Sequence, residues 1–169
     1  MRRAPFRTLT SGLAQTVSGA DGYGVKRLLV VSTILFLSTA LAQAQPDWLT
    51  NYDEAKTKAK SDNKFLLLDF TGSDWCGWCK RLNAEVFSKP QFQDYAAKNL
   101  VLVELDFPRA KAQTEEVKKQ NMQLASQYRI EGFPTIVVLN ADGRKIGELG
   151  YMEGGPAAFI AAIEKLRKS

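Results

Sequence analysis

The sequence predicts one α/β domain in which strands and helices alternate. Short apolar runs of the kind found in buried strands are separated by segments that have helical spacing and helix-start residues. Two further strand-like runs flank residues 140–143, an Asn-Ala-Asp-Gly segment that is typical of a hairpin turn. The 125 residues that follow an expected N-terminal leader are enough for one domain with one core.

The first half of this domain has distinct helix and strand signals. Thr50 and Asp53 have the spacing of a capping pair, and proline at position 90 favours the first turn of a helix. We therefore expect, in order, a helix at Thr50–Ser61, a strand at Phe65–Phe70, a helix at Cys76–Phe87, a helical segment at Pro90–Ala97 and a strand at Leu100–Leu105.

The second half repeats the alternation and ends on a helix. A helix expected over Thr114–Tyr128 has acidic residues in its first turn, where they favour the positive end of the helix dipole. Strands are expected at Thr135–Leu139 and Lys145–Leu149. Pro156 begins a last amphipathic helix, whose inward-facing residues are expected to be Phe159, Ile160, Ile163 and Leu166.

The only two cysteines, Cys76 and Cys79, stand three residues apart at the start of a predicted helix. This Cys-x-x-Cys spacing after a strand and its loop indicates a redox dithiol. A thiolate at Cys76 would face unpaired backbone N–H groups, which lower a cysteine pKa from about 8.5 into a range of roughly 3.5 to 7.5. We therefore expect Cys76 to be the nucleophile. Cys79, one turn further along the same face, is expected to resolve the mixed disulfide that Cys76 forms.

The composition excludes several other chemistries. The sequence has no histidine, which excludes a Cys–His protease pair, a Ser–His–Asp triad and a Cys/His zinc site within one chain. Lys80 follows the motif, where a c-type haem attachment site has histidine. We expect no cofactor and no metal. A structural disulfide and a metal site shared between subunits stay open as alternatives, although so short a loop stabilises little by loop closure.

Residues 1–44 are expected to be a leader. Lys26-Arg27 precedes the apolar stretch Leu28–Leu41, and Ala42-Gln43-Ala44 has the pattern of a cleavage site. We expect cleavage after Ala44 and export of a mature domain at residues 45–169. The alternative is an uncleaved leader that anchors the protein in a membrane, but the apolar stretch is shorter than the roughly 20 residues of a membrane span.

The first 24 residues are unusually polar for a signal peptide. A start at Val25 would give an ordinary short basic region, which suggests that residues 1–24 are not translated. Removal of residues 1–44 leaves 18 basic and 17 acidic side chains. This balance indicates no nucleic-acid partner, and the lysines between Lys56 and Lys60 are interpreted as a solvated helix face.

The element order, the Cys-Gly-Trp-Cys motif and the Phe133-Pro134-Thr135 segment together resemble the thioredoxin family over roughly residues 63–168. The resemblance implies the thioredoxin fold, an α/β single domain with a central mixed β-sheet flanked by helices, and thiol:disulfide oxidoreductase activity. It also implies that Pro134 is cis and faces the dithiol, and that Phe133 offers backbone groups to an extended substrate. With the leader and the loop at residues 150–155, the chain looks like exported members of that family, which act in the periplasm.

Asp69 is an acidic residue inside an apolar strand, where it needs a partner or a task. It lies near the place of the buried thioredoxin aspartate that takes the proton of the resolving cysteine, and burial would raise its pKa as a base requires. One extra residue within segment 71–74 separates it from the motif, and Glu104 stands where thioredoxin has a lysine. Asp69 is the favoured proton acceptor and Glu104 the alternative. The simpler interpretation of Asp69 is a strand-end residue that forms one hydrogen bond.

Five residues around the dithiol are expected to bind substrate: Trp75, Gly77, Trp78, Phe133 and Pro134. Core packing is an equal alternative for Trp75, whereas Trp78 is expected to be exposed. Thioredoxin has Gly-Pro between its cysteines in place of Gly-Trp, so its redox potential does not transfer to this chain. The segment Pro108–Gln123 is longer than its thioredoxin counterpart and is interpreted as a helical extension.

Three functions are consistent with these residues. The favoured one is an exported thiol:disulfide oxidoreductase, a monomer that acts on protein disulfides as reductase or isomerase-like donor and takes electrons from a membrane carrier. The second is a copper(I)-binding module, since thiolates favour that ion. The third is a non-catalytic interaction domain. The lack of histidine and of a methionine cluster near the motif argues against the second, and the intact motif argues against the third.

Overall fold

Strand β2, Phe65–Thr71, is the centre of the fold because it is almost entirely apolar and pairs on both of its edges. The computed structural model describes residues 47–168. The expected leader, its cleavage after Ala44 and the start at Val25 therefore lie outside the described residues.

The described residues form a mixed five-stranded sheet with the strand order β1-β3-β2-β4-β5. Strands β1 and β2 run parallel to β3, whereas β4 runs antiparallel to both β2 and β5. The remaining strands are β1 at Trp48–Leu49, β3 at Leu100–Asp106, β4 at Thr135–Leu139 and β5 at Lys145–Leu149.

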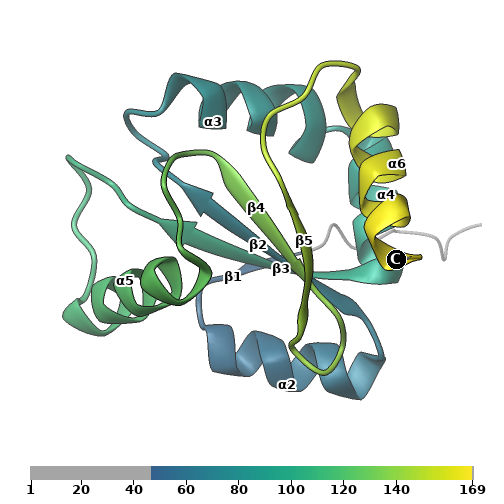
Figure 1. Cartoon of the computed structure of the whole chain (residues 1–169). Helices are drawn as coiled ribbons and strands as arrows, with labels where there is room; N and C mark the ends of the chain where they lie inside the picture. Colours follow the sequence, from purple (N-terminus) through teal and green to yellow (C-terminus); the bar gives the residue numbers. More distant parts are fainter. Residues whose placement is uncertain (1–46, 169) are drawn as a thin grey trace, which may run out of the picture. The chain divides into compact units, whose positions relative to one another are not determined.

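Helices cover both faces of this sheet (Figure 1). One face packs against α2 and α5, at Tyr52–Asp62 and Glu115–Tyr128. The other face is covered by α3 at Gly77–Leu82, the π-helix η1 at Asn83–Phe87, α4 at Pro90–Asn99 and α6 at Gly155–Arg167. This is the thioredoxin fold in one domain, as the sequence predicts.

The alternation of side chains along β2 divides the core into two halves. Leu66, Leu68 and Phe70 pack with α2 and α5, whereas Leu67 packs with the helices of the other face. Since strand side chains alternate between faces, Asp69 follows Leu67 and points to the face that α3 covers. The strand therefore places one carboxyl group beneath the helix that holds the dithiol.

The structure corrects some expected boundaries. The first helix begins at Tyr52 and not at Thr50. Its N-cap residue is Asn51, whose side chain accepts the amide of Glu54 at 3.1 Å. Strand β1 was not expected, since two residues give no periodic signal. The hairpin between β4 and β5 is confirmed, with Gly143 at φ 83° and its amide donating to the Asn140 carbonyl at 2.9 Å.

None of the helices within residues 47–168 has the length and apolar character that a membrane span requires.

Candidate active site

The dithiol lies where β2 and its loop lead into helix α3. Cys76 is the N-cap residue of α3 and has extended backbone angles, while Cys79 lies in the first turn. The two sulfur atoms form a disulfide with an S–S distance of 2.06 Å, so the structure shows the oxidised state. The expected placement of the pair at a strand-to-helix junction is confirmed.

Exposure does not distinguish the two cysteines, since each is 5% exposed. Hydrogen bonding does distinguish them. The backbone amide of Cys79 donates to the sulfur of Cys76 at 3.1 Å, in the way that an N-cap side chain accepts an unpaired helix amide. The same contact would stabilise a thiolate at Cys76 in the reduced protein, because a hydrogen bond to the charged form lowers a pKa.

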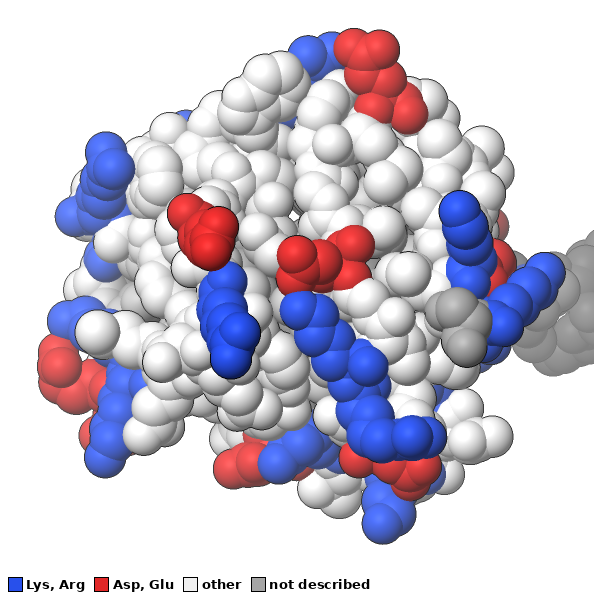
Figure 2. All heavy atoms as spheres, in the orientation of Figure 1, with Lys and Arg blue, Asp and Glu red and all other residues white. Residues whose placement is uncertain are grey.

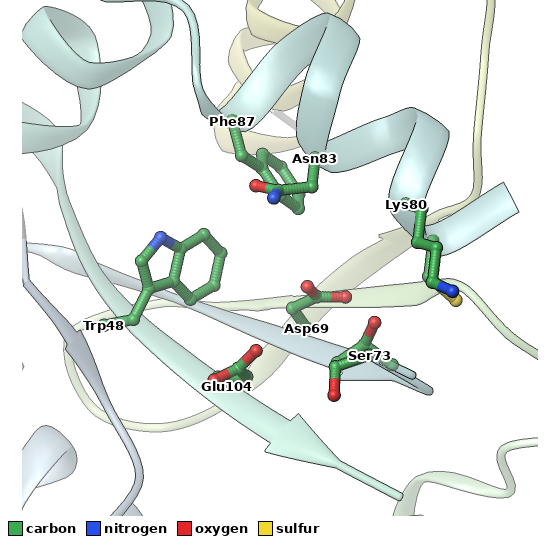
Figure 3. A pocket seen from close by; sticks show the side chains of 9 residues that line it. Trp48, Asp69, Ser73, Lys80, Asn83, Phe87 and Glu104 are labelled. Atoms are coloured by element: carbon green, nitrogen blue, oxygen red, sulfur yellow. The ribbon is translucent and has the colours of Figure 1, made fainter. Parts of the chain in front are cut away.

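A cavity of about 260 Å³ lies beneath α3 (Figure 3). In that view the side chains of Asp69 and Glu104 project toward the same space from neighbouring strands, where the two residues are register partners. The cavity is lined by Trp48, Asp69, Thr71, Ser73, Cys79, Lys80, Asn83, Phe87 and Glu104. It therefore joins both candidate proton acceptors to the expected resolving cysteine.

The electrostatics of the cavity favour protonated acids. Burial raises the pKa of Asp69 to about 8, and the neighbouring carboxylates of Glu104 and Asp106 add to the shift. Burial also raises the pKa of Glu104, and Asp106 adds to this while Lys111 opposes it. Asp69 is 8% exposed, and its Oδ1 has no hydrogen-bond partner among the described residues. The buried oxygen without a partner does not fit the simpler interpretation of Asp69 as a strand-end residue that forms one hydrogen bond.

Both tryptophans of the motif region reach the surface. Trp78 is 55% exposed, as expected, and packs against Tyr151 with ring centroids 5.0 Å apart and the ring planes tilted by 41°. Trp75 is 36% exposed and meets the ring of Phe133 edge-on at 5.8 Å. The expectation of a cis peptide is confirmed for Phe133-Pro134. One exposed ring therefore precedes Cys76 in the chain, and the other lies between the two cysteines.

The active-site loop is fastened to the segment that joins β3 to α5, a contact that the sequence did not predict. The carboxylate of Asp74 accepts the backbone amides of Arg109 at 3.1 Å and Ala110 at 2.7 Å. The indole N–H of Trp75 donates to the Phe107 carbonyl at 2.8 Å. The helical interpretation is therefore wrong for residues 108–114, which precede α5, and the amides of Arg109 and Ala110 bind a side chain 35 and 36 positions away.

Tyr151 and Glu85 are further residues of the site that sequence reasoning did not select. The Tyr151 hydroxyl donates to Glu85 at 2.7 Å, and Arg81 Nε donates to the other oxygen of that carboxylate at 2.7 Å. Glu85 lies in η1, and π-helical turns occur frequently at functional sites. This network supports the ring of Tyr151 against Trp78.

A dithiol that closes to a disulfide on this fold defines the class of protein, a thiol:disulfide oxidoreductase. The chain belongs to the thioredoxin-like family, since the family profile described as a thioredoxin-like domain matches residues 52–167. Within residues 47–168 no three His, Cys, Asp or Glu side chains are grouped as metal ligands.

Similar proteins handle disulfides. The disulfide bond reductase DsbH of Chlamydia pneumoniae is 36% identical over 128 residues, which are 76% of this chain and 76% of that protein. A solved structure of a DsbH oxidoreductase superposes with a TM-score of 0.71 at 35% identity, covering 78% of this chain and 90% of that one. The thioredoxin-related protein DsbJ of Chlamydia pneumoniae is 32% identical over 134 residues, 75% of this chain but only 38% of its own length.

Proposed function

We propose that this chain is an exported reductase that transfers electrons from the Cys76/Cys79 dithiol to disulfides of other exported proteins. The observation that carries the proposal is the amide of Cys79 aimed at the sulfur of Cys76, since this contact favours a thiolate at one sulfur of the pair. The similarity to a disulfide bond reductase supports the reducing direction.

The first step is attack by the Cys76 thiolate on one sulfur of a substrate disulfide. The substrate S–S bond breaks as the new S–S bond to Cys76 forms, and the second substrate sulfur leaves as a thiolate that takes up a proton. The helix start assists because the Cys79 amide and the dipole of α3 stabilise the attacking anion.

The second step is resolution by Cys79. Asp69 accepts the Cys79 proton, and the Cys79 sulfur attacks the sulfur of Cys76. The bond from Cys76 to the substrate breaks, the remaining substrate sulfur leaves as a thiolate that takes up a proton, and the disulfide that the structure contains is formed. Two electrons have then passed from the dithiol to the substrate. Asp69 suits this step because a carboxyl group with a pKa raised to about 8 is a base of useful strength near neutral pH.

Substrate binding is assigned to the surface around the dithiol. Trp75 and Trp78 offer exposed rings. A Cβ atom added at Gly77 would meet no other atom within 4 Å, so the surface is open there. Phe133 and Pro134 precede β4, where backbone groups of Phe133 can pair with an extended substrate segment by strand addition.

The proposed location is the periplasm, reached by cleavage after Ala44, with a membrane thiol-reducing carrier that returns electrons to the oxidised dithiol. The protein acts as a monomer on protein substrates. On the face shown in Figure 2, basic and acidic side chains are interspersed, which suits a protein without a nucleic-acid partner.

The test is the redox potential of the dithiol in the mature protein, residues 45–169. Equilibration with glutathione buffers and mass measurement of the oxidised fraction should give a potential closer to the about −270 mV of a reductant than to the about −120 mV of a strong oxidant. A potential near the roughly −120 mV of a strong oxidant would contradict the reducing direction and favour disulfide formation instead.

A further inference from the structure

Four cationic side chains surround the dithiol loop, and their partners differ. Arg81 forms an ion pair with Glu85 at 2.7 Å. Lys80 donates to the Asp74 carbonyl at 2.8 Å, and Lys111 donates to the Ser73 hydroxyl at 3.0 Å. Arg109 is exposed, and within residues 47–168 its guanidinium has no carboxylate partner. Lys80 and Lys111 also lack a carboxylate partner but each already donates a hydrogen bond, so Arg109 is the one of the four whose charged N–H groups form no hydrogen bond with the described residues.

Arg109 is held beside the dithiol by its neighbours. Its guanidinium carbon lies 4.0 Å from the ring centroid of Trp75, the residue directly before Cys76. Its backbone amide is bound by Asp74, whose carboxylate is thereby occupied and does not pair with the side chain. Trp75 is in turn fixed by its bond to Phe107 and by its contact with Phe133. The cation is thus placed by a fixed ring and a fixed backbone.

We propose that Arg109 is a specificity-determining residue that binds an acidic side chain next to the substrate cysteine, so that the enzyme prefers polypeptide disulfides flanked by Asp or Glu. The proposal rests on the proposed function, because it assigns a substrate class to the same dithiol. A guanidinium that stacks on a ring keeps its N–H edges free for a carboxylate, which it can bind through two parallel hydrogen bonds.

The two arginines on the two tryptophans make a matched pair. Arg81 lies 5.5 Å from the Trp78 ring, as Arg109 lies 4.0 Å from the Trp75 ring, but Glu85 already neutralises Arg81. Arg81→Gln and Arg109→Gln change the net charge equally. A preference that comes from long-range attraction would respond to both substitutions, whereas a direct contact would respond only to Arg109→Gln.

The experiment uses two peptides with the same internal disulfide, one with Glu and the other with Gln on both sides of one cysteine. The reduced mature protein is mixed with each peptide, and the second-order rate of peptide reduction is measured. Effects of a substitution on the Cys76 pKa are common to both peptides and cancel in the ratio of the two rates. Arg109→Lys, which keeps the charge, controls for local folding.

We expect Arg109→Gln to lower the Glu-to-Gln rate ratio by about two- to fivefold, the range of an exposed ion pair, while Arg81→Gln leaves the ratio unchanged. Arg109→Lys should keep part of the preference, and about 0.5 M salt should remove it. An unchanged rate ratio in Arg109→Gln, or an equal loss of the ratio in Arg81→Gln, overturns the inference about Arg109 and leaves the proposed function standing.

Two further outcomes separate the proposals. If the wild-type protein reduces neither peptide, the proposed function fails and the inference fails with it. Glutathione disulfide, which also bears carboxylates, is the third substrate. Should Arg109→Gln slow its reduction and leave the Glu peptide unaffected, the arginine serves a small thiol and the polypeptide assignment is wrong.

Discussion

Asp69→Asn is the substitution that most sharply separates a buried base from an ordinary strand residue. Asparagine keeps the shape of the side chain but cannot ionise, so it removes the buried negative charge and the proton acceptor together. The substitution should stabilise the fold at high pH and slow resolution of the mixed disulfide, leaving the first attack by Cys76 nearly intact.

The size of the stability effect follows from the pKa of Asp69, which burial raises from 3.8 in the unfolded chain to about 8 in the folded protein. The folded state holds the Asp69 proton more tightly, so the contribution of this group to stability is greatest below pH 3.8 and falls as pH rises toward 8. Each pKa unit corresponds to about 1.4 kcal/mol, so the wild-type protein should lose several kcal/mol, on the order of 4 kcal/mol, between pH 5 and pH 8 relative to Asp69→Asn.

Urea unfolding of the oxidised wild-type and variant proteins at pH 5 and pH 8 measures this quantity. The pH-independent cost of burying the asparagine amide is the same at both pH values and cancels in the difference. A stability difference between the two proteins that does not change with pH would refute the reasoning, because Asp69 would then titrate alike in folded and unfolded chains. Glu104→Gln is the control and should show the smaller change, since Glu104 is less buried than Asp69.

Three other predictions test separate parts of the site. Cys76 in reduced Cys79→Ser should titrate below the free-thiol value of about 8.5, because Cys76 is the N-cap residue of α3; the rate of iodoacetamide alkylation against pH measures this. Gly72→Ala should lower the melting temperature and displace Trp75, since an added Cβ would lie 2.5 Å from the Trp75 ring, whereas Gly132→Ala meets nothing within 4 Å and should be neutral. Asp74→Ala should raise hydrogen exchange at the amides of Arg109 and Ala110, which that carboxylate binds, and unchanged exchange would show that the loop holds itself.

Strands β2 to β5 and the dithiol were predictable because their signals are local. An apolar run such as Leu66–Leu68 must be buried, and its position before Cys76 places the motif at a strand-to-helix junction. The burial of Asp69 was predictable for the same reason, since an acidic residue inside an apolar strand is removed from water together with its neighbours. Glu104 was selected from the resemblance to thioredoxin, and the parallel pairing of β2 with β3 places it beside Asp69.

The contacts of the 107–111 segment were not predictable because they connect residues that are distant in sequence. Nothing near Arg109 or Ala110 indicates that their amides bind Asp74, and without that contact the residues resemble the start of the helix that follows. The stack of Arg109 on Trp75 depends on the same long-range contact. Sequence analysis therefore placed the two cysteines at the helix start and missed the long-range contacts of Asp74 and Arg109 beside them.

The most direct test of the account is to trap the mixed disulfide between the protein and a protein substrate. Reduced Cys79→Ser and reduced Cys76→Ser are each mixed with a substrate that contains a disulfide, and the products are digested and mapped by mass spectrometry. The account predicts that Cys79→Ser accumulates a covalent complex joined through Cys76, whereas Cys76→Ser forms none. A complex formed equally by both variants, or one joined through Cys79 alone, would contradict the assignment of Cys76 as the attacking sulfur.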